Sequence, residues 1–299
     1  RQQAADRAWA AISRFYAACR AKTPGRKGYP RFQHHCRSVE YKVTGWTLER
    51  DGRHIRFSDG HSIGRLRLVG TRSIEQFPVE QIKRVRLLRR VDGYYCQFCV
   101  QAERRMPHVP TGRHLGIDVG LTAFLTDSDG VAEPNPRYLR AAEPKLKRLH
   151  RRVSRKAKGS KNRQKARKRL ARVYLHVSRQ REDHARKLAG TLISSCDWIA
   201  YEDVQVRNMV KNHHLAKSIS DASWARFLWW VEHYAHSHAI VAVAVPPHWT
   251  SLDCSGCKRR VRKSLSVRTH HCPHCGLLLD RDHNAARNIL RESYNRTAG

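Results

Sequence analysis

Four cysteines near the C-terminus have the spacing of a metal site. They form two C-x2-C pairs separated by 14 residues: Cys254, Cys257, Cys272 and Cys275. Four thiolates at such spacing are typical of a closed, tetrahedral zinc site. Because four protein ligands leave no open position for water, we expect this zinc to be structural. Three histidines near the second pair, His270, His271 and His274, are alternative ligands.

A third C-x2-C pair, Cys96 and Cys99, lies in the segment "YYCQFCV". This segment has the composition of a strand, in which positions i and i+3 point to opposite faces. The two thiols therefore cannot easily chelate one ion, and we interpret both as packing residues.

One aspartate lies in an apolar segment where a charge is costly. Asp118 is in "GIDVG", which we interpret as a buried strand, and a buried carboxylate needs a partner or a metal ion. Gly116 and Gly120 flank it and remove side chains where a phosphate backbone could approach. Taken alone, Asp118 could instead cap a turn at the end of the strand.

Two further acidic positions lie where secondary-structure elements end or begin. Glu202 ends the apolar segment "WIAYE", with Asp203 beside it, and alternation along a strand lets only one of the two face Asp118. Asp280 and Asp282 lie at the expected start of the last helix, where acids are also favoured as caps and by the helix dipole. A solvent-facing turn acid and a helix cap are therefore the alternatives.

Taken together, Asp118, Glu202 and Asp282 indicate one acidic centre. Three such carboxylates can hold two divalent metal ions about 4 Å apart, which activate water and stabilise the leaving oxygen in phosphodiester cleavage. Oxygen-only ligands favour Mg²⁺ or Mn²⁺ over zinc.

The charge of the chain points to a polyanionic partner. Its 299 residues include 59 Lys and Arg against 25 Asp and Glu, a formal net charge of +34. We expect nucleic acid; a membrane surface is the alternative, although the longest apolar run, residues 239–245, is too short to span a bilayer. The odd number of cysteines, nine, and the lack of a visible signal peptide favour a reduced, intracellular protein.

The elements that must position these residues form two parts. A helix over residues 1–22 precedes short alternating runs between 38 and 103, which predict a small β-barrel or sandwich. After a linker at 106–112, strands alternate with crossover helices, which predicts an α/β fold. A helix is expected around 221–237, with three tryptophans that we assign to the core: Trp224, Trp229 and Trp230.

Two expected helices, residues 143–157 and 163–193, concentrate positive charge. Between Lys145 and Lys187 there are 19 Lys and Arg and only two acids. A charge run is often only a solvated face, but these charges repel one another without an anionic partner. The candidate nucleic-acid contacts are Lys145, Lys147, Arg148, Arg151, Arg152, Arg155, Lys156, Lys161, Arg163, Lys165, Arg167, Lys168, Arg169 and Arg172.

Four motifs in order give the chain a family resemblance. The segments "GIDVGL", "IAYEDV", "TSLDCSGC…HCPHCG" and "DRDHNAARNI" resemble the split RuvC nuclease and embedded zinc ribbon of TnpB. TnpB is the transposon-encoded, RNA-guided nuclease related to type V CRISPR effectors. "GYPRF", "KGSKNRQKARKRLARV", "VQVRNMVKN" and "LAKSISDASW" also fit that family, so the resemblance covers nearly the whole chain.

The resemblance implies an α/β, RNase H-like RuvC nuclease domain with an N-terminal β-barrel, a helical region and an inserted zinc ribbon. The implied parts are a truncated helical recognition region (1–35), a wedge-like β-barrel (36–105), the first part of the RuvC-like domain with the basic helices (106–250), the zinc ribbon (251–279) and the RuvC-like C-terminal helix and tail (280–299). The implied catalytic triad is Asp118, Glu202 and Asp282; Asp282 is chosen over Asp280 because it precedes "x-N-A-A".

The resemblance also implies cofactors and partners. These are Mg²⁺ or Mn²⁺ at the triad, structural Zn²⁺, a guide RNA and a target DNA, with no membrane. We expect a monomer in the cytoplasm, associated with the nucleoid if the source is bacterial. A nuclease-silent RNA-guided repressor and a guide-independent nuclease or transposition factor are the alternatives. One departure concerns the ribbon, where Lys258 replaces the glycine usual after the first cysteine pair.

Overall fold

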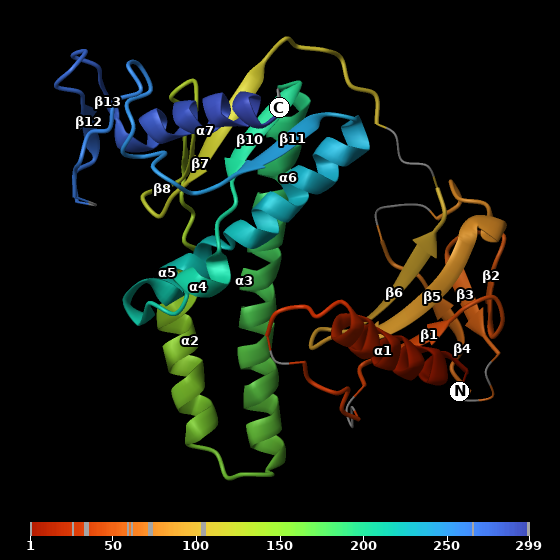
Figure 1. Ribbon diagram of the computed structural model, residues 1–299. Helices are drawn as coiled ribbons and strands as arrows, with labels where there is room; N and C mark the ends of the chain where they lie inside the picture. The colour runs from red at the N-terminus through yellow and green to blue at the C-terminus, as the bar shows by residue number, and fades with distance from the viewer. Residues whose placement is uncertain are drawn as a thin grey trace. The chain divides into compact units, whose positions relative to one another are not determined.

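The protein consists of two compact units, which we describe separately. The computed structural model describes residues 2–25, 27–32, 36–58, 60, 62–70, 74–102, 106–264 and 266–297. Unit 1 is Arg1–Glu103 and unit 2 is Arg104–Gly299 (Figure 1). The division into five functional parts remains a prediction.

Unit 1 combines one helix with two three-stranded antiparallel sheets. Helix α1 is Gln2–Arg20. One sheet has the order β1 (Ser38–Tyr41), β5 (Ile82–Arg89), β6 (Tyr94–Val100); the other has the order β2 (Trp46–Leu48), β3 (His54–Phe57), β4 (Gly64–Arg67). A 3-10 turn, η1 (Val79–Gln81), precedes β5. The predicted hairpin-rich part is thus present.

Both sheets of unit 1 contribute to one hydrophobic cluster. Tyr41 and Val85 come from the first sheet, and Ile55 and Phe57 from the second. Two separate sheets around one core correspond to the sandwich form of the prediction; closure into a barrel is not confirmed.

The interpretation of the third C-x2-C pair is half right. Cys96 is half-buried and packs against the unit 1 cluster, where burial raises the pKa of its thiol to about 12. Cys99 is exposed, so its assignment as a packing residue is wrong. As expected from strand geometry, the two side chains leave opposite faces of β6.

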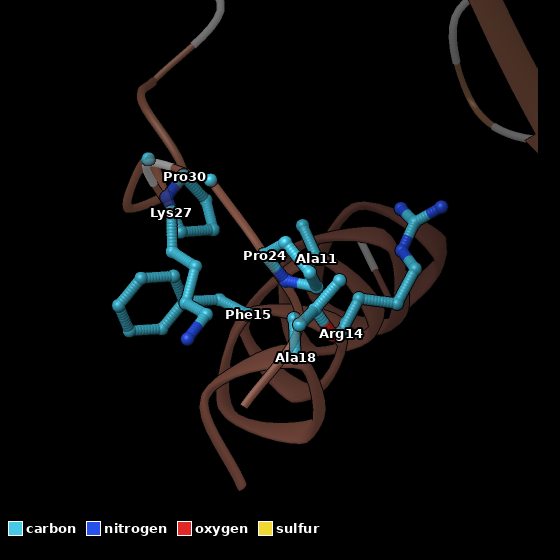
Figure 2. Close-up of a pocket in the computed structure, with 10 residues that line it drawn as sticks. Ala11, Arg14, Phe15, Ala18, Pro24, Lys27 and Pro30 are labelled. Atoms are coloured by element: carbon cyan, nitrogen blue, oxygen red, sulfur yellow. The ribbon is translucent and has the colours of Figure 1, made fainter. Parts of the chain in front are cut away.

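A pocket of about 490 Å³ lies between α1 and the following Pro- and Gly-rich segment (Figure 2). Arg14 and Phe15 line it from the helix, and Lys27 and Pro30 from the segment. The ring of Phe15 also meets the edge of Tyr29 at a centroid distance of 5.2 Å, which holds the segment against α1.

Unit 2 is built on a mixed five-stranded sheet. Its order is β11 (Val241–Val245), β10 (Trp198–Glu202), β7 (His114–Val119), β8 (Ala123–Asp127), β9 (Ala132–Pro134). Strands β11, β10 and β7 are parallel, whereas β8 is antiparallel to both of its neighbours. The central strands are apolar on both faces because helices cover both sides of the sheet.

The two faces of this sheet carry different clusters. On one face, Leu115 and Ile199 pack with residues of α3 (Lys161–Ser194) and α6 (Trp224–His238). On the other face, Ala200 and Val245 pack against Ile289 of α7 (Arg281–Thr297). The predicted α/β architecture of this part is confirmed.

Helix α2 (Tyr138–Ser154) and α3 form the predicted basic hairpin, and α2 begins five residues earlier than expected. The early start has a tertiary cause. The buried carboxylate of Asp221 accepts hydrogen bonds from the backbone N–H groups of Leu139 (2.8 Å) and Arg140 (3.1 Å), which replaces a local cap. Arg181 of α3 donates to the same carboxylate at 2.7 Å.

The helix expected around 221–237 is α6, which begins three residues later, at Trp224. After the short α4 (Val206–Met209), α5 (His213–Ala222) ends at Ser223, whose φ of 59° separates it from α6. Of the three tryptophans, Trp224 is buried and Trp230 packs against the core, but Trp229 is 45% exposed, so its core assignment is wrong. Within the described residues, no helix has the length and apolarity needed to cross a membrane.

Candidate active site

Asp118 and Glu202 end two neighbouring parallel strands in the same register. The pairing of β7 and β10 aligns Gly116 with Ala200 and Ile117 with Tyr201, so the next position aligns Asp118 with Glu202. Neighbouring strands are roughly 4.8 Å apart, and residues in register on parallel strands project from the same face. The two carboxylates therefore lie side by side, whereas Asp203 is exposed.

Helix α7 brings Asp282 close enough to act electrostatically on Asp118, although the oxygens of the three carboxylates do not all lie within 4.8 Å of one another. A Cβ on Gly116 would lie 2.2 Å from the carbonyl oxygen of Ala286, so α7 crosses this part of β7 in direct backbone contact. Asp282 is about one helical turn before Ala286, and a Cβ on Gly120 would lie 3.7 Å from its Oδ2. Gly116 thus makes room for α7, and its interpretation as a gap for a phosphate backbone is wrong.

The electrostatics of Asp118 reflect this convergence. Its pKa is raised well above the ordinary value, first by burial and then by the negative charges of Glu202 and Asp282, with a smaller opposing effect from Arg281. Burial also raises the pKa of Glu202, although a hydrogen bond from Thr250 opposes the shift. The cluster thus has a surplus of negative charge, which a bound cation would relieve.

The two aspartates at the start of α7 have different roles. Asp280 Oδ1 accepts the backbone N–H groups of Asp282 (2.8 Å) and His283 (3.3 Å), so Asp280 caps the helix. The carboxylate of Asp282 instead pairs with Arg281 at 3.0 Å and Arg268 at 3.4 Å. The expected capping role therefore belongs to Asp280, which leaves Asp282 beside Asp118.

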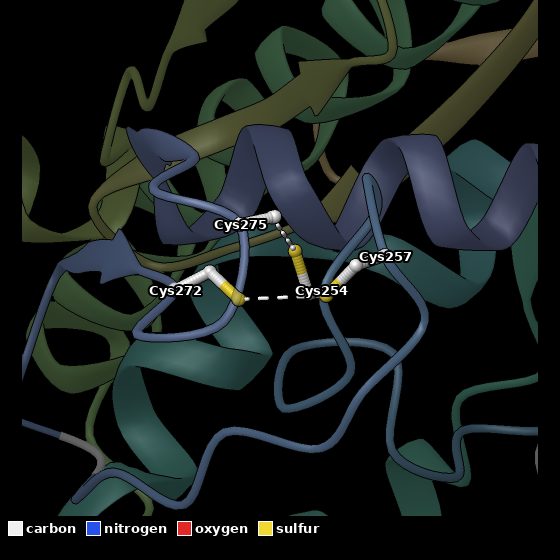
Figure 3. Close-up of side chains that lie close together, drawn as sticks. All are labelled: Cys254, Cys257, Cys272 and Cys275. Atoms are coloured by element: carbon white, nitrogen blue, oxygen red, sulfur yellow. Dashed lines mark hydrogen bonds between the residues drawn. The ribbon is translucent and has the colours of Figure 1, made fainter.

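The four predicted cysteines form one cluster, shown in Figure 3. All four Sγ atoms lie within 4.8 Å of one another, and the pairs Cys254–Cys275 and Cys257–Cys272 are each 3.6 Å apart. A tetrahedral zinc with Zn–S bonds of about 2.3 Å has S···S edges of about 3.8 Å, so the cluster fits a zinc site with four cysteine ligands.

Histidines take no part in this cluster among the described residues. His270 is fully buried, and its Nδ1 lies 2.7 Å from the ammonium group of Lys263. The preference for four cysteine ligands over His270, His271 and His274 therefore agrees with the geometry.

Comparisons with known proteins cover most of the chain. Residues 97–213 match the family described as "OrfB_IS605: Probable transposase", and residues 224–289 match "Cas12f1-like, TNB domain". A "TnpB-like protein L79" of Acanthamoeba polyphaga mimivirus is 26% identical over 138 residues, which cover 44% of this chain and 26% of that protein. These matches confirm the resemblance to TnpB, since the chain is similar to proteins of that name over these segments.

Two bacterial relatives of this TnpB-like chain are similar over longer segments. A "Putative RNA-guided DNA endonuclease" of Streptomyces pristinaespiralis is 39% identical over 186 residues, covering 62% of this chain. The "Putative RNA-guided DNA endonuclease InsQ" of Escherichia coli (strain K12) is 26% identical over 282 residues, covering 89% of this chain. The matches span 46% of the first relative's length and 68% of the second's.

Solved structures give partial superpositions on the TnpB-like chain. A Cas12f1–sgRNA–target DNA complex aligns with a TM-score of 0.46 and 12% identity, covering 92% of this chain and 74% of that one. The mini-RNA-guided endonuclease CRISPR-Cas_phi3 aligns with a TM-score of 0.48 and 11% identity, covering 76% and 54%.

In this TnpB-like chain, backbone geometry explains the unusual residue of the ribbon. Lys258 follows the first cysteine pair with a φ of 65°, and Gly276 follows the second with a φ of 72°. The N–H groups of both donate to the carbonyl of the first cysteine of their pair, each at 2.9 Å. The two turns are therefore equivalent, and Lys258 adopts a left-handed conformation that favours glycine.

Two buried asparagines, to which the sequence patterns assigned no role, join the ribbon to α7. Asn284 Nδ2 donates to the carbonyl of Asp253 at 2.9 Å, while its Oδ1 accepts the N–H of Ser255 at the same distance. Asn288 Nδ2 donates to the carbonyl of Thr250 at 2.7 Å. The hairpin of β12 (Thr269–His271) and β13 (Leu278–Asp280) then leads directly into α7.

The fourteen candidate nucleic-acid contacts all lie on the α2–α3 hairpin or its connecting turn, and all but Arg163 are exposed. Arg163 is half-buried and donates to the carbonyl of Lys156 at 3.3 Å. Lys147 pairs with Glu143 at 3.1 Å, where a second cation, Lys217, also binds. Leu146 of α2 and Val177 of α3 are buried, whereas the candidate contacts other than Arg163 are exposed, so their charges form an outer basic surface.

Proposed function

We propose that this TnpB-like chain is a transposon-associated, RNA-guided DNA endonuclease that hydrolyses target DNA at Asp118, Glu202 and Asp282. The observation that carries the proposal is the convergence of the three carboxylates: two in register on parallel strands and one at the start of the helix that crosses them. The five-stranded mixed sheet with helices on both faces also agrees with the RNase H-like RuvC domain that the resemblance implies.

The residues of this centre suit Mg²⁺ or Mn²⁺. The donors are carboxylate oxygens, and the raised pKa of Asp118 reflects the negative charge that a cation would balance. Asp118, Glu202 and Asp282 would hold the ions, which supply water activation and stabilisation of the leaving oxygen when bound. The hydrogen bond from Thr250 orients Glu202, and the ion pairs with Arg281 and Arg268 orient Asp282.

Charge and relatives support a guide RNA and a target DNA as partners. The net charge of +34 and the outer basic surface of the α2–α3 hairpin suit a duplex held through its phosphates. The two bacterial relatives are named as RNA-guided endonucleases. In such systems base pairing with the guide reads the target sequence, whereas the protein holds the duplex backbone.

The site assignment is tested by two matched substitutions. Asp118→Ala should abolish metal-dependent cleavage while nucleic-acid binding stays nearly intact, because only a metal-holding carboxylate is removed. Asp203→Ala, next to Glu202 but exposed, should leave cleavage unchanged. Cleavage retained by Asp118→Ala would refute the assignment.

The guided activity is tested by sequencing the RNA that copurifies with the protein expressed beside its native flanking DNA. We expect one dominant RNA that ends in a variable segment and directs cleavage of a matching DNA. Guided binding without cleavage would favour the silent repressor, and cleavage without RNA the guide-independent nuclease.

A further inference from the structure

An exposed tryptophan lies at the entrance to the zinc ribbon. Trp249 is 53% exposed and adopts a φ of 65°, a conformation that a bulky residue rarely takes. Its carbonyl oxygen accepts the N–H groups of Leu252 (2.9 Å) and Asp253 (2.8 Å), which closes a tight turn around it. Burial therefore does not explain the indole, and the backbone at this position would suit glycine better.

The orientation of the indole is set by a charged neighbour. The guanidinium of Arg260 lies over the ring at 3.9 Å from its centroid. Arg260 is itself held by Asp253, whose Oδ1 accepts from its Nε at 2.8 Å. One face of the ring is thus covered by a fixed cation, and more than half of the side chain's surface remains open to solvent.

The turn that carries Trp249 is attached directly to the acidic centre. Thr250, the next residue, donates through Oγ1 to Glu202 Oε1. The carbonyl oxygen of Thr250 accepts from Asn288 Nδ2 of α7 at 2.7 Å. Trp249 is therefore the residue next to Thr250, which is hydrogen-bonded both to Glu202 of β10 and to Asn288 of α7.

We propose that Trp249 positions the DNA strand that enters the acidic centre. An unpaired base of this strand stacks on the exposed ring. The proposal rests on the function proposed above. Every base has a π face, so stacking holds a strand without regard to sequence, as a guided nuclease requires. The cation of Arg260 on the other face keeps the ring in place.

Trp229 provides a matched control in the same unit. It is also exposed, at 45%, but its ring stacks on His233 at an interplanar angle of 2° and a centroid distance of 5.2 Å. The guanidinium of Arg226 lies 5.5 Å from the same ring. Trp229 therefore offers less free aromatic surface, and it is held by α6 instead of the turn beside Glu202.

The test measures binding of single-stranded DNA oligonucleotides that differ only in the position of one abasic site. All proteins carry Asp118→Ala, so that the strand is bound and not cut, and the readout does not depend on the proposed nuclease activity. The proteins compared have Trp249 intact, Trp249→Ala, Trp249→Phe or Trp229→Ala. Trp249→Phe keeps an aromatic face, which separates loss of stacking from loss of the turn.

With Trp249 intact, an abasic site at one position should weaken binding at least about fivefold, the lower end of what a stacked base contributes. With Trp249→Ala, the same abasic site should cost nothing further, whereas Trp249→Phe and Trp229→Ala should keep most of the penalty. An equal abasic penalty with and without Trp249, or failure of the strand to bind, overturns the proposal. Failure of the protein with Asp118 intact to cleave a guided target, while this coupling is present, would instead refute only the proposed nuclease function.

Discussion

Gly116 lies on β7 directly beneath α7, and its replacement by alanine should separate the helix from the strand. The added Cβ would be 2.2 Å from the carbonyl oxygen of Ala286, 2.8 Å from Leu290 Cβ and 2.9 Å from Leu290 N. Two of these neighbours are backbone atoms of α7, so a change of rotamer cannot relieve the contact. Because Cβ atoms essentially never come within 3.0 Å of such neighbours, the helix must move by about 1 Å.

Such a displacement has two measurable consequences. Overpacking of this kind costs about 1–3 kcal/mol of unfolding free energy. Since α7 carries Asp282, the third carboxylate moves as well, and a misplacement of about 1 Å can reduce a reaction rate about 100-fold. Zinc content should stay unchanged, because the four cysteines lie in the ribbon and not on β7.

The assays are urea unfolding, metal analysis of the purified protein and guided cleavage of a matching DNA. Gly190→Ala in α3 is the matched control, because its Cβ would meet only Tyr234 Cε2 at 3.8 Å, an ordinary contact. Inside a helix this change should stabilise the protein by up to about 1 kcal/mol. Wild-type stability and cleavage in Gly116→Ala would refute the argument that α7 and β7 are in backbone contact.

Three further predictions concern stability. Asp221→Ala leaves the half-buried Arg181 and the first N–H groups of α2 without their acceptor, so urea unfolding should show a loss of about 3 kcal/mol of unfolding free energy. Asp183→Ala, which breaks an exposed pair with Lys187, should change the unfolding free energy by less than about 1 kcal/mol, and equal effects of the two substitutions would contradict the capping role of Asp221. Lys258→Gly should stabilise the ribbon by about 1 kcal/mol by removing a left-handed lysine, and a loss of zinc affinity in a chelator competition would show this to be wrong. The pKa of Asp197 is lowered mainly by the hydrogen bond from the backbone N–H of Thr111 and, to a smaller extent, by the hydrogen bond with the His108 side chain. The contribution of ionised Asp197 to stability should therefore be present above its unfolded pKa of about 4 and be lost as pH falls below that value. Asp197→Asn should reduce this acid sensitivity, and unfolding curves between neutral pH and about pH 3 would reveal the difference.

Much of the site could be predicted from residue types and local spacing. The ligands of the cysteine cluster were predictable because two short C-x2-C turns each place a pair of thiols, and the structure brings the two pairs together. Glu202 was identifiable because it ends an apolar run that can only be a buried strand. Asp280 and Asp282 stayed open as alternatives at this level, because the local pattern does not distinguish them. The resemblance to TnpB made that choice.

Other features depend on segments far apart in the sequence. Gly116 is required by α7, which lies about 170 residues later and occupies the space where a side chain would be. The start of α2 depends on Asp221 of α5, so no cap signal appears near residue 138. Trp229 was assigned to the core because of its helical spacing, and Cys99 was interpreted as a packing residue because strand geometry argued against chelation. Both are exposed, because exposure depends on what covers a face and not on local spacing alone.

By itself, the sequence determined the residue types, their order and the short-range geometry. It showed which cysteines share a C-x2-C turn, which strands are buried and where positive charge accumulates. The tertiary structure alone decided which carboxylates share a face, because this depends on strand register and on the backbone contact between β7 and α7. It also attached the exposed ring of Trp249 to Glu202 through Thr250, a relation between residues 48 positions apart. Local propensities act over a few residues, whereas register and packing are properties of the whole fold.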